Sequence, residues 1–445
     1  MEHTFNYLKN LFQEIKSETK QNPTFVVLIF VLISIPLGYA INGIAVGLFV
    51  LITLVTLKKS NIRIDKNLIY PIVLYFLMVI SIFWSHDGNA TLKALSKTIP
   101  LLVLPLCFMI FPKFSNLQKQ KIISYYSYGM LLFILYYLVK AGIRFAVTHN
   151  TNVFFYHELV TEDLNAIHAS LYMAVAGIYF ITKFQKSSLD KIAIAIIAIF
   201  LVLLSSKNIS VIFFGLVAVF YLRYYKSSTK INSLKIVSFL LLLLAIAFTG
   251  KIKDRFLIEY YSNVSENSLN QETGSANAEV NNISVMQAWS KERFQPNDYF
   301  PGTAFRVYQI RIFVEMLQED FILLTGYGLN ATDFRIAEKG KEHNVYSGDA
   351  THDGYQKKNF HNQYIQTFAE LGILGLLLLL IMLLLNIKNA IKTKDFVHIS
   401  FAILMISLFL TESFLSRQRG IVFFSTLYCL FNAELGNILH PIKES

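Results

Sequence analysis

The chain has 445 residues, of which 54% are hydrophobic and only 16% are charged, and its mean hydropathy is +0.48. An ordinary soluble domain carries roughly a quarter charged residues, so this composition excludes a soluble globular protein and favours an integral membrane protein. The formal net charge of +11 would suit nucleic acid or another acidic partner. The placement of Lys and Arg assigns most of that excess to membrane orientation instead.

Apolar runs long enough to cross a membrane recur along the chain. A helix needs about 20 residues to span about 30 Å of hydrocarbon. Continuous runs of this length exclude a membrane β-barrel, whose strands alternate lipid-facing and lumen-facing residues. We therefore predict an all-α integral membrane protein with about twelve transmembrane helices, near residues 24–40, 41–57, 69–84, 98–111, 121–139, 166–182, 190–204, 208–224, 233–250, 363–387, 397–411 and 420–436.

The residues before the first apolar run are polar and include Glu14, Lys16, Glu18 and Lys20. The run that follows lacks the small-residue pattern of a cleavage site. We expect no cleavable signal peptide, and we predict that the first run stays as a membrane anchor.

The positions of Lys and Arg give an orientation. With a cytoplasmic N-terminus, about 21 of the 40 Lys and Arg residues lie in short cytoplasmic segments, against about 7 in short segments on the opposite side. The remainder lie in one long connection between the ninth and tenth predicted helices. The asymmetry predicts that both chain ends are cytoplasmic and that the long loop is not. The basic residues are therefore orientation signals and do not indicate a nucleic-acid-binding surface.

Three regions follow from this topology: residues 1–250 with helices 1–9, residues 251–362 as a partly helical outer loop, and residues 363–445 with helices 10–12 and a cytoplasmic tail. A connection as long as the loop is usually functional or disordered. Its first half, around Asn263 to Ser284, is rich in Asn, Ser, Glu and Gln and is typical of a mobile linker.

The second half of the loop has a helical pattern. Between Thr303 and Asp320, four apolar residues recur at helical spacing and predict an amphipathic helix: Val307, Ile310, Val314 and Leu317. We expect Gly326 and Gly328 to break this helix before a polar tract that runs to the next membrane helix.

The sequence offers no motif for a metal or a nucleotide. It contains no Asp-x-Asp pair and no His, Asp and Glu set with zinc spacing. The Gly326-Tyr327-Gly328 pair lacks a third glycine at nucleotide-binding spacing. Cys107 and Cys429 lie inside apolar runs, where a buried small hydrophobe is the simpler interpretation. We predict no disulfide, no metal and no cofactor.

Cationic side chains nevertheless gather on the predicted outer side. Arg suits diphosphate oxygens because its planar fork stays charged and donates two hydrogen bonds at once. Histidine ordinarily titrates near neutrality and can accept a proton from a hydroxyl. Each residue also has a structural alternative, since an Arg at a helix end often contacts lipid head groups and a lone His is often structural. The candidates are Lys207, Arg306, Arg311, Arg417, Arg419, His168 and His361.

Several segments together resemble the O-antigen ligase and polymerase family of bacterial membrane proteins. The family pattern is an Arg-led helix, a Gly-x-Gly turn and a His-Asn pair, followed by Glu-Leu-Gly-x-x-Gly on a membrane helix. The matching segments are Arg306-Val307-Tyr308-Gln309-Ile310, Thr325-Gly326-Tyr327-Gly328 with Phe334, His361-Asn362-Gln363-Tyr364-Ile365-Gln366 and Glu370-Leu371-Gly372-Ile373-Leu374-Gly375-Leu376, with weaker similarity at Asn165-Ala166-Ile167-His168, Ser205-Ser206-Lys207, Glu412-Ser413 and Arg417-Gln418-Arg419-Gly420.

Two positions depart from the family pattern. The family's Ser-Arg is Ser206-Lys207 here, which keeps a positive charge but loses the bidentate fork. The Trp often found four residues after the loop Arg is Ile310 in this chain.

The resemblance implies a glycosyltransferase of the bacterial inner membrane that works at the periplasmic face. It would transfer a glycan from a polyprenyl diphosphate to a hydroxyl on a second glycolipid, without metal or nucleotide. In this interpretation Arg306, Lys207 and Arg311 neutralise the diphosphate, and His361 acts as general base or as a positioning donor toward the acceptor hydroxyl. Asn362, His168, Arg417 and Glu370 would orient these groups or bind sugars, although Glu370 should lie on the opposite helix face from His361.

Three hypotheses about function stay open. A ligase would join O-antigen to lipid A core, whereas a polymerase would extend the glycan on its lipid carrier. The single dominant outer loop favours the ligase. A lipid or solute transporter is the third hypothesis, but transporters usually show repeated halves and interrupted helices at the membrane centre, and the sequence shows no such repeat.

Overall fold

A computed structural model of the chain describes residues 2–161, 163–224, 280–349 and 354–433. Within these ranges it is almost wholly helical, which confirms the all-α class. The strands found there are the short parallel pair β1 (Asn281–Asn282) and β2 (Asp298–Tyr299). Among the described residues, five helices are long and apolar enough to cross a membrane by length and composition, and four apolar helices are shorter. The total of about twelve spans stays a prediction.

The helices follow the predicted apolar runs. They are α1 (Glu2–Gln21), α2 (Thr24–Ile33), α3 (Tyr39–Val55), α4 (Lys66–Ile80), α5 (Gly88–Thr98), α6 (Pro100–Ile110), α7 (Asn116–Thr148), α8 (Ala166–Thr182), α9 (Ser188–Leu203), α10 (Lys207–Val219), α13 (Val285–Ser290), α14 (Gly302–Glu319), α15 (Asp333–Glu342), α16 (Gln363–Thr393), α17 (Phe396–Phe409) and α18 (Gln418–Asn432). The predicted span near 233–250 and most of the predicted linker lie outside the described residues.

Polar residues begin several of these apolar helices. Ser115 and Gln118 form a capping box at the start of α7, and the Asn362 side chain accepts a hydrogen bond from the Ile365 amide at the start of α16. Such caps satisfy backbone donors that have no partner within the helix. They fix where the membrane helices begin.

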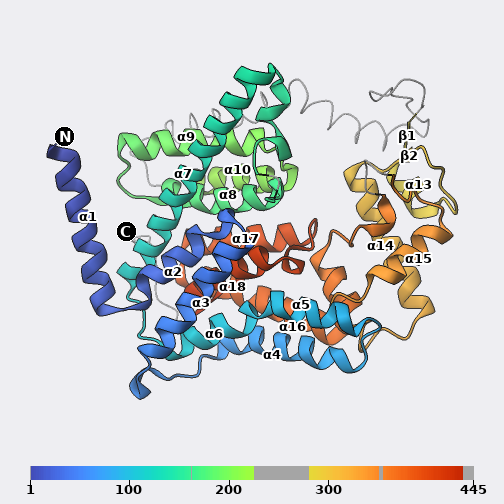
Figure 1. Cartoon of the computed structure of the whole chain (residues 1–445), viewed down its shortest axis with the longest axis horizontal. Helices are drawn as coiled ribbons and strands as arrows, with labels where there is room; N and C mark the ends of the chain where they lie inside the picture. The colour runs from blue at the N-terminus through green and yellow to red at the C-terminus, as the bar shows by residue number, and fades with distance from the viewer. Residues whose placement is uncertain (1, 162, 225–279, 350–353, 434–445) are drawn as a thin grey trace.

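The described residues form a helical bundle with a smaller unit at one end. Figure 1 shows α13, α14 and α15 together at the right end of the bundle, while α1 lies at the opposite end. The small unit has its own core, which includes Tyr308, Ile312 and Met316 of α14. These residues show that α14 buries a different face from the predicted stripe, whose members Val307, Ile310, Val314 and Leu317 are only partly buried.

Helix α14 covers the predicted range to within one residue, but the predicted glycines do not end it. It stops at Glu319, and Asp320 is already extended, so Gly326 and Gly328 do not terminate it. The two glycines have positive φ angles of 66° and 98° and lie where the chain returns to α16.

Helix α16 is interrupted where this returning segment meets it. Gly372 has φ 67° and ψ −168°, a conformation that is essentially confined to glycine. The amides of Tyr327 and Gly328 donate to the carbonyls of Ala369 and Glu370, and the Ile373 amide donates to the Leu323 carbonyl. The predicted span over 363–387 lies within α16, and the loop supplies the backbone partners that the break at Gly372 exposes.

Candidate functional site

The link between α17 and α18 carries a buried carboxylate, Glu412, at the end of the bundle that adjoins the small unit. The side chain of Glu412 is about nine-tenths buried. Burial penalises a charge, so an ionised carboxylate here needs partners. Two histidines and an arginine from three other segments supply them.

His361 is the nearest of these partners. Its Nδ1 lies 3.5 Å from Glu412 Oε1, and its side chain keeps about a third of its surface exposed. The residue sits just before α16 with a positive φ of 47°, and its amide donates to the Asn359 side chain. With Nδ1 turned to the carboxylate, the other ring nitrogen is left for a substrate.

Arg306, in the first turns of α14, reaches the same link. Its Nε donates to the Thr411 carbonyl at 3.1 Å, and its Nη1 donates to the Gly302 carbonyl at 3.0 Å. Both acceptors are neutral, so the described residues leave the guanidinium charge without a carboxylate at ion-pair distance. The expected convergence of Arg306 and His361 is thus present in the structure.

Lys207 and Asn362 lie beside this cluster. Lys207 begins α10, and the next residue, Asn208, donates to the Thr411 hydroxyl at 2.9 Å. The Asn362 amide group donates to the Leu410 carbonyl at 3.2 Å. Both contacts tie the ends of α10 and α16 to the end of α17.

His168 approaches Glu412 from the interior. It lies in the first turn of α8, is buried, and packs its ring 4.6 Å from the ring of Phe414. Because it is enclosed, it suits a supporting role better than direct contact with a substrate.

Arg417 and Arg311 are placed differently. Arg417 is exposed at the start of α18, and no acceptor for its guanidinium lies among the residues that the structure describes. Arg311 forms an ion pair with Glu315 at 2.8 Å and donates to the Lys291 carbonyl. Its described partners therefore belong to the small unit and not to the cluster around Glu412.

Glu370 joins the cluster only indirectly. It accepts a hydrogen bond from Gln366 Nε2 at 2.7 Å, and the Gln366 oxygen faces the Ser413 hydroxyl at 3.3 Å. Through Gln366, Glu370 thus supports the position of Ser413, the residue that follows Glu412. Among the described interactions, Glu370 makes no contact with His361.

The described groups around Glu412 keep its carboxylate charged. Burial alone would raise the pKa of Glu412, but His361, His168 and Arg306 together hold it below its usual range. The carboxylate therefore stays ionised at neutral pH and orients the groups around it. Among the described residues, Arg306 and Arg417 have no carboxylate partner, and their charges suit an anionic ligand.

Across the described ranges, no group of three or more His, Cys, Asp and Glu side chains is arranged to hold a metal ion. Glu412 has histidine and arginine neighbours instead of a second carboxylate.

Glu412 is the residue to which sequence reasoning gave no role. Its segment was part of the family resemblance, but nothing in its local sequence points to His361, 51 positions earlier in the chain. Only the packing of α16 against α17 brings the two together.

Comparison with known families supports the resemblance. Residues 192–380 match the family model described as O-Antigen ligase, and this family supports glycosyl transfer by a multi-pass membrane protein. The match includes Lys207, Arg306, His361 and Asn362, whereas His168, Glu412 and Arg417 lie outside it. A search of curated proteins gave no match.

Proposed function

We propose, from the premise that residues 192–380 form a domain of the O-antigen ligase family, that the chain transfers a glycan from a polyprenyl diphosphate to a hydroxyl of an acceptor glycolipid. The leading reaction is ligation of O-antigen to lipid A core at the periplasmic face of the inner membrane. Extension of the glycan on its lipid carrier is the second candidate. The proposal rests above all on the convergence of His361 and Arg306 at Glu412.

The chemistry needs a base and a positive surface. The acceptor oxygen attacks the anomeric carbon of the donor while the bond from that carbon to the diphosphate oxygen breaks. The polyprenyl diphosphate leaves with the bonding electrons, and the hydroxyl proton moves to the free ring nitrogen of His361. Glu412 holds the opposite nitrogen and stabilises the imidazolium that forms, as in other carboxylate and histidine pairs.

Arg306 would stabilise the leaving group. The described residues leave its charge without a carboxylate ion pair, so charge developing on the diphosphate is its natural partner. Lys207 and Arg417 would add long-range attraction, while Asn362 and His168 would support the arrangement from either side. Because Arg311 is paired with Glu315, we assign it the weakest role among the proposed diphosphate contacts.

The test is a transfer assay with the purified full chain and a defined lipid-linked glycan. Lipid A core and a second lipid-linked glycan are offered separately as acceptors, without ATP and with or without EDTA. Product on lipid A core supports the ligase, and product only on the second carrier supports the polymerase. Failure with both acceptors, or a dependence on added Mg²⁺ or Mn²⁺, would contradict the proposed chemistry.

Arg306→Lys provides a sharper arm of the same assay. The substitution keeps the charge but loses the planar fork, so turnover should fall about tenfold if the guanidinium donates two hydrogen bonds to diphosphate. The matched control is Arg144→Lys, because Arg144 lies on α7 and forms an exposed ion pair with Glu158. Equal turnover in both variants would show that Arg306 does not act on the diphosphate.

A further inference from the structure

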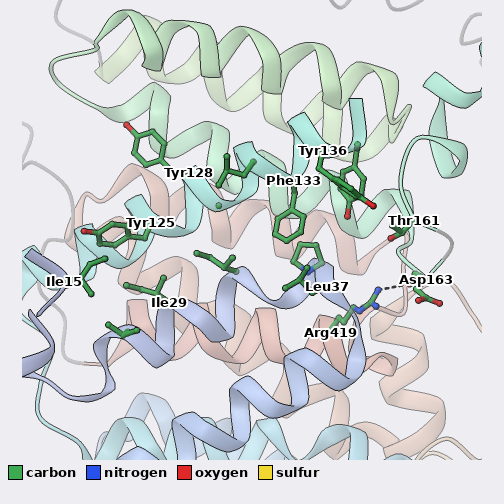
Figure 2. Close-up of a pocket in the computed structure, with 16 residues that line it drawn as sticks. Ile15, Ile29, Leu37, Tyr125, Tyr128, Phe133, Tyr136, Thr161, Asp163 and Arg419 are labelled. Atoms are coloured by element: carbon green, nitrogen blue, oxygen red, sulfur yellow. Dashed lines mark hydrogen bonds between the residues drawn. The ribbon is translucent and has the colours of Figure 1, made fainter. Parts of the chain in front are cut away.

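A groove runs along the outside of the bundle between α2 and α7. Its volume is 740 Å³, and its α7 side presents residues at helical spacing: Tyr125, Tyr128, Gly129, Leu132, Phe133, Tyr136 and Tyr137. Ile29, Ile33 and Leu37 line the opposite side. Figure 2 shows these side chains along the two helices, from Ile15 and Tyr125 at one end to Thr161 and Arg419 at the other.

Helices α2 and α7 lie close together at Gly129 and Ile33, which both line the groove. A Cβ built on Gly129 would lie 2.9 Å from Ile33 Cγ1, so a larger residue there would push α2 and α7 apart. Around this point the side chains are open to the surroundings, with Leu132 67% and Tyr136 55% exposed. On a membrane helix, such surfaces face lipid.

The length of the groove suits one acyl chain. From Tyr125 to Tyr137, α7 rises about 18 Å at 1.5 Å per residue. Half of a bilayer's hydrocarbon thickness is about 15 Å. A chain that starts at one surface and ends near the membrane centre would therefore occupy the groove along most of its length.

One end of the groove carries a fixed guanidinium. Arg419 is only 3% exposed, its Nη1 donates to the Asp163 carbonyl at 2.7 Å, and its guanidinium lies 4.4 Å from the centre of the Tyr39 ring. Its Nε is buried without an acceptor in the described part of the chain. The guanidinium is therefore held in a fixed position inside the protein where it lines the end of the groove.

We propose that the groove binds one acyl chain of an anionic glycerophospholipid of the outer leaflet, with the phosphate of that lipid at Arg419. Arg419 supplies the positive charge and the unfilled donor capacity that a phosphate diester needs. Among the described interactions, Arg419 makes no contact with His361 or Arg306. On the side of Glu412, the ring of Phe414 packs against the ring of His168. The groove is therefore a lipid site separate from the proposed diphosphate site.

The experiment uses the purified full chain in a non-ionic maltoside and a phosphatidylglycerol that carries a photoreactive group in one acyl chain. Crosslinked peptides are identified by mass spectrometry. We expect label on α2 and α7, and a decrease of about tenfold in Arg419→Gln, because a charged hydrogen bond to phosphate is lost. Arg144→Gln removes a charge from the same end of α7 without touching the groove and should label like the wild type.

A second variant guards against misfolding of Arg419→Gln. Leu132→Trp fills the groove at an exposed position while Arg419 stays intact, and it should also reduce labelling severalfold. Leu135→Trp, on α7 but not in the groove, is its control. Wild-type labelling in both Arg419→Gln and Leu132→Trp would overturn the proposal.

Competition identifies the occupant. Unlabelled phosphatidylglycerol should displace the probe, whereas diacylglycerol, which lacks phosphate, and inorganic phosphate, which lacks chains, should not. Equal competition by diacylglycerol would show that Arg419 does not bind the phosphate group of the lipid. Displacement by polyprenyl diphosphate at lower concentration than phosphatidylglycerol would assign the groove to the glycan donor and overturn the proposal. None of these measurements requires glycan transfer, so their outcome is independent of the proposed function.

Discussion

The charge of Glu412 controls how the residues around it are arranged. An isolated carboxylate at this burial would be costly, but His361 and His168 lie on two sides of it and Arg306 approaches through the neighbouring Thr411 carbonyl. Removing any one of these groups would change the electrostatic environment of the remaining ones. Two predictions follow at the scale of single residues.

The first concerns His361→Asn. Asparagine tolerates the left-handed backbone at this position, so the variant should fold while it loses the proton acceptor. We expect glycan transfer to fall on the order of a hundredfold or more, the usual range for a general base, with donor binding retained. The rate is measured with saturating lipid-linked glycan.

His149→Asn is the matched control, because His149 also has a left-handed backbone, with φ 52°, and is exposed at the end of α7. It should transfer glycan at the wild-type rate. Near wild-type transfer by a well-folded His361→Asn protein would remove His361 from the chemistry and leave it as the residue that precedes α16.

The second prediction concerns the pH dependence of stability. The folded protein holds the pKa of Glu412 below its usual value, because its interactions with His361, His168 and Arg306 outweigh the effect of burial. Its stabilisation is therefore fully present above the unfolded pKa of about 4.3 and is lost as the pH falls through the lower folded value. The difference in Tm between wild type and Glu412→Gln should be largest near pH 7 and should shrink toward pH 3.5.

Glu292→Gln is the control for this series, since Glu292 is exposed and has no ion pair in the described part of the chain. Its Tm should follow the wild type at every pH. A Tm difference for Glu412→Gln that does not change with pH would mean that the charge of the carboxylate contributes nothing.

The sequence identified some of these residues and missed others for a physical reason. His361 and Arg306 stand out because they lie in the segments that resemble the O-antigen ligase and polymerase family, whereas by themselves an Arg at a helix end and a lone His have common structural uses. Glu412 follows an apolar helix and looks like an ordinary polar helix end. Its burial, and hence its importance, arises from contacts between segments far apart in the chain, which local pattern does not contain.

At the scale of elements, the break in α16 is the feature that positions the loop. The segment from Leu323 to Gly328 pairs its backbone with the helix on both sides of Gly372. The Gly326-Tyr327-Gly328 turn and the segment around Gly372 therefore contact each other directly. The apolar run predicted the position of α16. The pattern cannot show a break in the helix, because the backbone partners at the break come from another segment.

Gly372→Ala tests this contact. A Cβ at Gly372 would lie 2.1 Å from the Leu324 carbonyl oxygen, and the backbone there is strained for any residue but glycine. We expect a loss of roughly 1–3 kcal/mol or more, seen as a lower Tm and faster proteolysis between Leu323 and Gly328. In contrast, Gly142→Ala places its Cβ in open space on α7 and should be neutral or stabilising by up to about 1 kcal/mol. Similar behaviour of the two variants would contradict the docked arrangement.

At the scale of the whole molecule, hydropathy located the helices because lipid demands long apolar segments with internally satisfied backbones. Each predicted span within the described ranges falls on helix, although the first is interrupted at Ser34. Length is harder to predict: α2 has only 10 residues, and such short helices cross a bilayer only with help from neighbouring turns. The number of crossings therefore needs a direct experiment.

The structure gathers the predicted outer residues at one end. His361, Thr411 and Lys207 lie there together, as does Asp163 through Arg419. At the other end, Lys119 at the start of α7 donates to the carbonyl of Ala433, just after α18. The two ends of the bundle thus separate the predicted outer segments from segments rich in Lys and Arg.

We predict that the end with Glu412 faces the periplasm and that the opposite end is cytoplasmic, because the excess of Lys and Arg lies in the short segments at that opposite end. Ser290→Cys on α13 and Ser60→Cys between α3 and α4 replace exposed serines on the two sides, while Cys107 and Cys429 are buried and should react little. An impermeant maleimide should label Ser290→Cys in intact spheroplasts and Ser60→Cys only after the membrane is opened. The reverse pattern would invert the topology, and labelling of both variants in intact spheroplasts would mean that the number of crossings between them is even.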